Sequence, residues 1–346
     1  MMRTLPGCFK IFAICCLALL GAADAKAQAT TGDTYYQTFP DLLTTRFYLS
    51  GKYTGFRIRE KTDNTRYVYM PNTSLNMGVG ATYKWATLNL AYGFGFLNPD
   101  HNQGDTRYLD LQAHIYPRKF VIDAFGQFYK GYHLEERGRG ARSDDDFYVR
   151  PDIVLTKIGA SVQYLFNHER FSYRAAFMQN EWQQKSAGSF LLGFEMYGGR
   201  IAGDSVLVPV PLIGSEAGNF TKLNFFEFGP NAGYAYTLVI KKHFFITGSA
   251  SANLGVGYSE KQEDAGTHTE WGINPNLFLR GFVGYNAGRW AISANYVRNN
   301  VRVISNQGFS NTIMTGNYRL NFVYRFTTGP KLNQRILRHI DRLGAE

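Results

Sequence analysis

Apolar and polar residues alternate with a period of two through most of this chain, and no other feature constrains its fold as strongly. Successive side chains of a β-strand point to opposite faces, so the pattern predicts strands with one apolar and one polar face. The alternation is sharpest near the end, where one parity carries Tyr318, Leu320, Phe322, Tyr324 and Phe326. The other parity carries Arg319, Asn321, Val323 and Arg325. The sequence therefore predicts an all-β protein.

The composition indicates which face of these strands meets lipid. Hydrophobic residues make up 45% of the 346, aromatic residues 16% and charged residues only 18%. This aromatic content with so little charge excludes a disordered chain. The polar faces carry Gly, Ser, Thr and Asn in place of the Lys and Glu that usually cover soluble sheets. Many apolar faces end in an aromatic residue, as the girdles of membrane barrels do. We therefore expect the apolar faces to contact lipid.

An open sheet would leave unpaired backbone groups in lipid, so the strands are expected to close on themselves. The predicted fold is a closed antiparallel transmembrane β-barrel of about 14 strands, an even number as in bacterial barrels, followed by a short C-terminal helix. This count includes strands at 170–180 and 200–210. It becomes about 12 if 200–222 is one excursion and 45–58 lies outside the wall.

The N-terminus has the features of a secretory signal. Arg3 and Lys10 lie beside an apolar segment at 8–20, and Ala25-Lys26-Ala27 supplies the small residues that signal peptidase cuts after. A cleaved signal of this kind, on a chain of membrane-type strands, predicts the outer membrane of a Gram-negative bacterium. The expected organisation is a signal peptide at 1–27, a periplasmic linker at 28–44, the barrel at 45–327 and a basic amphipathic periplasmic tail at 328–346.

Five stretches of the chain share a recognisable pattern: Tyr69-Met70-Pro71-Asn72-Thr73, residues 75–84, residues 88–96, Tyr108-Leu109-Asp110-Leu111-Gln112 and residues 125–132. Together they resemble a family of outer-membrane barrels catalogued only as a domain of unknown function, DUF4421. The resemblance covers most of the chain after residue 27. It implies a barrel in the outer membrane, and it implies no catalytic residue because the family has no assigned activity.

The polar parity faces the lumen of such a barrel, and on it bases outnumber acids. The predicted lumen bases are Arg57, Arg59, Lys157, Arg174, Arg280, Arg319 and Arg325, and the acids are Asp110, Asp123, Glu195 and Glu227. Two interpretations stay open. Fixed positive charge in an open pore favours anions, whereas a salt-bridged interior fills a closed barrel and holds it rigid.

One hairpin brings polar residues together on its inner face: Asp110, Gln112, His114 and Asp123. The turn at Pro117-Arg118 is expected to place Gln112 near Asp123. A histidine beside carboxylates suits general-base or metal chemistry, but no nucleophile accompanies it, and a plain hydrogen-bond network is the alternative. The sequence also lacks His-Glu-x-x-His, P-loop and Gly-x-Ser-x-Gly motifs. We expect no catalytic residue, no metal site and no cofactor.

These observations predict an integral outer-membrane barrel without enzymatic activity, acting as a pore or as a structural or interaction barrel. The alternatives are an outer-membrane enzyme that uses the Asp/His cluster and a soluble secreted β-barrel with its faces reversed. Expected partners are outer-membrane lipid and the barrel-assembly machinery, which would engage the last strand at 315–327. The net charge of +10 is spread along the chain without a Lys/Arg run, so nucleic acid is not an expected partner. The sequence pattern does not specify a small solute or a periplasmic protein as a partner.

Overall fold

The computed structural model describes residues 34–40, 42–61, 64–83, 86–99, 102–208, 220–263, 266–305, 308–327 and 329. The predicted signal peptide at 1–27 lies outside the described residues. So does the predicted C-terminal helix, because residue 329 is the only described position of the tail at 328–346. Within the described ranges, no helix combines the length and the hydropathy needed to cross a bilayer.

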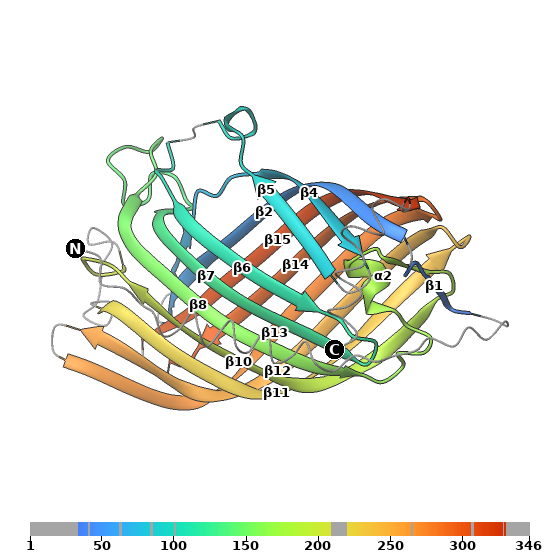
Figure 1. Cartoon of the computed structure of the whole chain (residues 1–346). Helices are drawn as coiled ribbons and strands as arrows, with labels where there is room; N and C mark the ends of the chain where they lie inside the picture. Colours follow the sequence, from blue (N-terminus) through green and yellow to red (C-terminus); the bar gives the residue numbers. More distant parts are fainter. Residues whose placement is uncertain are drawn as a thin grey trace.

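Ten antiparallel strands pair in a closed ring (Figure 1). The ring closes where the last strand pairs with the first along its whole length, from Phe309 opposite Glu60 to Thr327 opposite Leu42. In ring order the strands are β2 (Leu42–Glu60), β3 (Arg66–Met70), β7 (Phe120–Leu134), β8 (Val149–Leu165), β10 (Ala187–Ala202), β11 (Phe220–Ile240), β12 (Phe244–Glu263), β13 (Gly266–Ala287), β14 (Trp290–Val303) and β15 (Phe309–Thr327).

Three further strands pair onto this ring without being part of its closure: β4 (Asn76–Tyr83), β5 (Ala86–Tyr92) and β6 (Arg107–Ile115). β3 and β4 follow one another along the same edge of β2, and β3 then pairs directly with β7 through Tyr69 and Met70. This direct contact leaves β4, β5 and β6 outside the closed circuit. The predicted totals of 14 and 12 strands are therefore both wrong.

Two other features lower the strand count. The predicted strand at 170–180 is instead a loop with the short helix α2 (Tyr173–Phe177), whose N-cap Ser172 accepts a hydrogen bond from the Ala175 N–H at 3.1 Å. The predicted extra strand at 200–210 does not form in its described part. β10 continues to Ala202, and residues 203–208 form bends.

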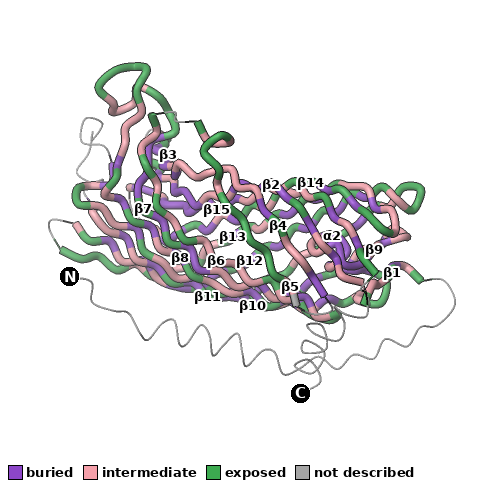
Figure 2. Tube along the Cα trace, turned by 45° about the horizontal axis from the view of Figure 1, so that its top comes forward, coloured by how far each residue is buried: buried purple, intermediate pink, exposed green. Residues whose placement is uncertain are grey.

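Side chains around the ring are arranged inside out compared with a soluble barrel. Large apolar side chains such as Phe190, Leu192 and Phe194 are 53–68% exposed on the outer surface. Polar side chains such as Gln163 and Asn231 are 2–3% exposed inside. Figure 2 shows the resulting alternation of buried and exposed residues along the strands. The sequence-based assignment of apolar faces to the outside is therefore correct for this part of the wall.

The polarity of both faces reverses toward one end of the barrel. On the outer face of β2, Phe47 is followed farther along by Arg57 and Arg59, while on the inner face Arg46 gives way to an apolar residue at position 56. A buried apolar cluster fills the inside at this end, with members from many strands: Phe56, Ile58, Tyr69, Tyr132, Leu155, Tyr197, Leu223, Val301 and Ile313, among others. We call this the loop-end zone, because β5, β7 and β10 end there and β6, β8 and β11 begin there, each after a long connection. The opposite end, with the turns at 116–119, 241–243 and 288–289, is the turn-end zone.

A small plug occupies the lumen of the turn-end zone. It consists of α2, β9 (Glu181–Gln183) and β1 (Tyr36–Thr38), and β1 pairs with β9 in a separate two-stranded sheet. The predicted periplasmic linker at 28–44 therefore contains β1 and the start of β2. Figure 1 shows α2 and β1 at the end of the barrel opposite the long loops. The rim holds the plug through the Trp182 indole, which donates to the Lys242 carbonyl at 2.8 Å.

Candidate functional site

An ion pair between Asp123 and Arg280 crosses the lumen next to the plug. Asp123 lies on β7 and Arg280 on β13, which are diametrically opposite in the ring, and the side chains are only 7% and 4% exposed. Arg280 also donates to the Tyr173 hydroxyl of α2 at 2.7 Å, and its guanidinium lies over the Phe177 ring at 4.9 Å. Burial raises the pKa of Tyr173, so this hydroxyl stays neutral. The ion pair thus connects two opposite strands of the barrel, β7 and β13, with the plug helix α2.

His114 and Tyr116 complete the shell of Asp123. The His114 Nδ1 lies 2.6 Å from the Asp123 Oδ1, and the Tyr116 hydroxyl donates to the same oxygen at 2.8 Å. The expected neighbour of Asp123 was Gln112, and that expectation is wrong by two residues. The hairpin register places His114 opposite Asp123 and Gln112 opposite Phe125.

Asp110 belongs to a second, separate group. The Lys52 Nζ lies 3.4 Å from its Oδ1, and Gln112 donates to the same oxygen at 2.8 Å. The Tyr129 hydroxyl and the Gln127 amide donate to its other oxygen at 2.8 and 3.2 Å. The four polar residues predicted as one cluster therefore form two, and each carboxylate is saturated with donors.

The predicted lumen bases do not form a ring of free charge. Lys157, Arg280, Arg319 and Arg325 point inward as expected, whereas Arg174 lies on the plug, 3.7 Å from Glu181. Two of the predicted lumen bases, Arg57 and Arg59, are on the outer face, because β2 directs its even-numbered residues inward. Their placement in the lumen was wrong.

Lys157 lies fully buried at the centre of the barrel between two aromatic rings. Its Nζ is 4.9 Å from the Phe125 ring and 5.4 Å from the Tyr197 ring, and it donates to Thr315 across the lumen at 3.2 Å. The predicted lumen acids also have amide partners. Glu195 accepts from Asn231 at 3.1 Å and Glu227 from Asn276 at 2.8 Å. The middle of the lumen is therefore a bonded polar network.

The wall has a gap on one side. β5 pairs only with β4 and β6 pairs only with β7, so within the described residues no ladder joins β5 to β6, which Figure 1 draws as separate ribbons. The residues of β5 from Leu88 to Tyr92 are exposed on both faces, including Asn89 on the inner parity. On β6, which borders the gap, the His114 side chain is 43% exposed. His114 is therefore the member of the Asp123 cluster that solvent or a ligand can contact, since Asp123 and Arg280 are buried.

Several residues that hold the site together were not predicted from the sequence. Arg46 donates to Thr82 at 2.5 Å and to the Met178 carbonyl of the plug at 3.1 Å. Arg325 was predicted to face the lumen, but its role was not: it donates to the Gln179 carbonyl at 2.7 Å. The signal for Arg46 lies in its parity, because Phe47 and Leu49 alternate with it along β2. The acceptors of these bonds are the backbone carbonyls of Met178 and Gln179, and no pattern of side chains predicts which carbonyl accepts a bond.

The clusters have the composition of a structural network more than that of a reaction centre. Among the described residues, no group of three or more His, Cys, Asp or Glu side chains is placed to hold a metal ion. The hydrogen-bond partners of His114 are Asp123 and Tyr116, and no serine or threonine hydroxyl contacts its ring nitrogens in the described residues. A Ser–His arrangement for nucleophilic catalysis is therefore not formed there.

The fold and the lumen define the class of this protein: a closed antiparallel β-barrel with an apolar outer belt and a filled polar interior. The chain belongs to the family described as a domain of unknown function (DUF4421), whose model matches residues 31–326. Among curated proteins, none matches the chain.

Solved structures of low similarity include three barrels. The outer membrane protease OmpT from Escherichia coli is 10% identical, with a TM-score of 0.36, over 84% of this chain and 98% of that one. The translocator domain of the autotransporter NalP from Neisseria meningitidis is 7% identical, with a TM-score of 0.33, over 82% and 88%. The toluene transporter TodX from P. putida is 6% identical, with a TM-score of 0.26, over 84% and 92%.

Proposed function

We propose that this chain is an integral outer-membrane barrel without enzymatic activity, closed along its axis and accessible from the side. It would act as an interaction barrel that receives an amphipathic molecule or a partner segment at the β5–β6 gap. The observation that carries the proposal is the set of bonds between opposite sides of the barrel, because side chains that meet across the lumen occupy the space an axial water path would need. This favours the filled interior over the anion-biased pore.

Bonds cross the lumen at two levels, and an apolar cluster fills it at a third. Asp123 and Arg280 join β7 to β13 above the plug. Lys157 and Thr315 join β8 to β15 in the middle. Higher still, the apolar cluster of the loop-end zone fills the interior, and there the Tyr69 hydroxyl donates to the Leu207 carbonyl at 2.6 Å.

The outer surface supports membrane insertion. A barrel strand needs about 9–11 residues to cross a bilayer, and β12 and β13 have 20 and 22. Both strands are therefore long enough to cross and to continue beyond the apolar belt. The reversal of polarity in the loop-end zone fits this geometry, because a barrel outside the membrane needs polar residues outside and an apolar core inside.

The gap explains why access would be lateral. Unpaired strand edges are costly in hydrocarbon and also serve as templates for an added strand. Here two such edges, on β5 and β6, have no ladder between them in the described residues, and the exposed His114 lies on β6. A ligand with polar groups toward His114 and an apolar part toward lipid would satisfy both environments.

We expect the wild-type chain to be electrically silent in a planar lipid bilayer with potassium chloride, because side chains fill the lumen at three levels. Insertion is checked in parallel by heat-modifiable migration on a gel and by dependence on detergent for extraction. Stepwise conductance from a verified folded preparation would overturn the closed-barrel proposal. A mature chain that stays monomeric in buffer without detergent would overturn the membrane location.

The runner-up is an enzyme based on the short contact between His114 and Asp123, with His114 exposed at the gap. We expect His114→Ala to leave hydrolysis of a panel of lipids and peptides at the background level of wild type. A measurable wild-type rate that is lost in His114→Ala and retained in the matched exposed variant His268→Ala would establish the enzyme instead.

A further inference from the structure

An arginine patch lies on the outer face of the barrel where the apolar belt ends. It comprises Arg57 and Arg59 on β2, Arg66 on β3, and Arg298 and Arg302 on β14. The ladders bring these strands side by side, with β15 between β2 and β14. The other four guanidinium groups lie near enough to Arg57 to repel its charge.

The patch places like charges in direct opposition. Arg59 and Arg66 are cross-strand partners in the β2–β3 ladder, and like charges at such positions destabilise a sheet. Within the described ranges, no carboxylate forms an ion pair with any of the five arginines, and the one side-chain hydrogen bond among them joins Arg298 to Asn300 at 3.4 Å. Five arginines on one surface without an ion-pair partner among the described residues favour an external anion.

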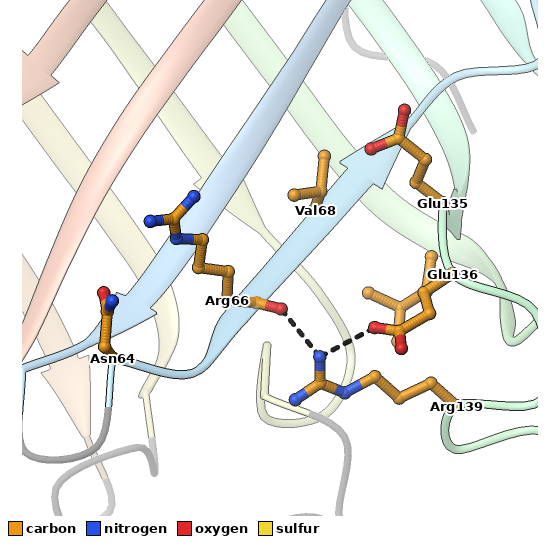
Figure 3. Close-up of a pocket in the computed structure, with 7 residues that line it drawn as sticks. Asn64, Arg66, Val68, Glu135, Glu136 and Arg139 are labelled. Atoms are coloured by element: carbon orange, nitrogen blue, oxygen red, sulfur yellow. Dashed lines mark hydrogen bonds and ion pairs between the residues drawn. The ribbon is translucent and has the colours of Figure 1, made fainter.

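The described acidic side chains beside Arg66 in the pocket of Figure 3 do not neutralise the patch. Figure 3 shows Arg66 extending away from Glu136, which is paired with Arg139 at 2.8 Å. Arg139 also donates to the Arg66 carbonyl at 3.0 Å, so it ties the loop to the strand through the backbone. Glu135 lines, with Arg66 and Glu136, the pocket drawn in Figure 3, and it forms no ion pair among the described residues. Among the described residues, one flanking carboxylate against five arginines leaves the patch positive.

The position of the patch along the barrel identifies the depth of its ligand. The outer face of β14 changes from Ile292 through Tyr296 to Arg298 and Arg302. The Tyr296 hydroxyl lies 3.3 Å from that of Tyr53 on β2. Paired tyrosines between an apolar belt and charged residues mark the interfacial level of a bilayer. The arginines therefore lie at the level of the headgroups on the long-loop side.

We propose that the arginine patch binds the phosphate groups of a lipid headgroup in the leaflet on the long-loop side. Arginine suits this role because its planar guanidinium makes paired hydrogen bonds to phosphate and keeps its charge at any physiological pH. The arginines lie on β3, β2 and β14, with β15 between β2 and β14. A headgroup with two phosphates fits this spread better than a headgroup with one. The inference depends on the membrane location proposed above and adds a specific ligand class to it.

The test uses folded full-length mature protein in detergent and native mass spectrometry with diphosphoryl lipid A, monophosphoryl lipid A or phosphatidylcholine. We expect the order of affinity to follow the number of phosphates. The triple variant Arg59→Gln/Arg66→Gln/Arg302→Gln should lose about thirtyfold for diphosphoryl lipid A, a factor of about three per exposed contact. A matched variant at the opposite end, Lys241→Gln/Lys242→Gln, should bind like wild type.

Three outcomes would overturn the proposal: equal affinity for phosphatidylcholine and lipid A, unchanged affinity in the triple variant, or an equal loss in the Lys241/Lys242 control. Inorganic phosphate is added as a competitor. Full displacement of lipid A at equal phosphate concentration would assign the patch to free phosphate and refute the lipid. Heat-modifiable migration of every sample separates these results from failure of the barrel itself, because a misfolded or water-soluble chain fails that control first.

Discussion

Arg280→Met should destabilise the folded barrel by about 3–5 kcal/mol, the range observed when one partner of a buried ion pair is removed. Asp123 would remain a charged group of 7% exposure without its cation. The guanidinium also holds the Tyr173 hydroxyl, so the plug loses its contact with β13. The measurement is urea unfolding in detergent, followed by loss of the heat-modifiable band.

Two comparison variants isolate the ion pair from the loss of volume. The double variant Arg280→Met/Asp123→Leu removes both charges, and we expect it to regain most of the lost stability, since an apolar pair of similar size often replaces a buried ion pair without cost. Arg200→Met removes an arginine that is exposed on β10, and it should change stability by less than about 0.5 kcal/mol. A stable single variant, or a double variant less stable than Arg280→Met, would contradict a bracing role.

The alternation in the sequence was sufficient to predict a barrel with apolar faces outward, because each strand repeats the same local signal. It was not sufficient to orient Arg57 and Arg59. At that level of β2 the inner residues Phe56 and Ile58 are apolar, so a rule that places apolar residues toward lipid inverts the strand. β2 pairs with β15 without interruption through the level at which its two faces exchange polarity. The polarity pattern along one strand therefore does not show where the membrane ends.

The number of strands and the plug depend on contacts between distant segments. β3 excludes β4, β5 and β6 from the ring because it pairs with β7, more than 60 residues farther along the chain, through Tyr69 and Met70. The plug helix has only 5 residues, with Tyr173 buried against Arg280. Local propensity for so short a helix is marginal. Burial in the lumen decides its conformation, and a single sequence carries no direct signal for that burial.

Removing α2 and β9, the two plug elements between β8 and β10, should open the turn-end lumen to reagents, which is the second large effect we expect. Residues 28–346 contain no cysteine, so Ser249→Cys would be the only thiol of a protein that begins at residue 28. Ser249 is 7% exposed, and its Oγ lies 3.4 Å from the Tyr173 hydroxyl of α2. With residues 170–184 replaced by a Gly-Gly linker, a polar maleimide should label this cysteine about a hundredfold faster, because labelling would no longer require local opening of the plug.

An exposed reporter in a long loop, Asp145→Cys, should react equally fast with and without the plug, which separates access from reagent quality. Rapid labelling of Ser249→Cys in the intact chain would contradict the plugged lumen. The same plug-free variant should remain silent in a planar bilayer, because the apolar cluster of the loop-end zone still fills the other half of the barrel. Conductance on removal of the plug alone would show that the loop-end zone is open to water, and the seal would then have to be assigned to α2 and its neighbours only.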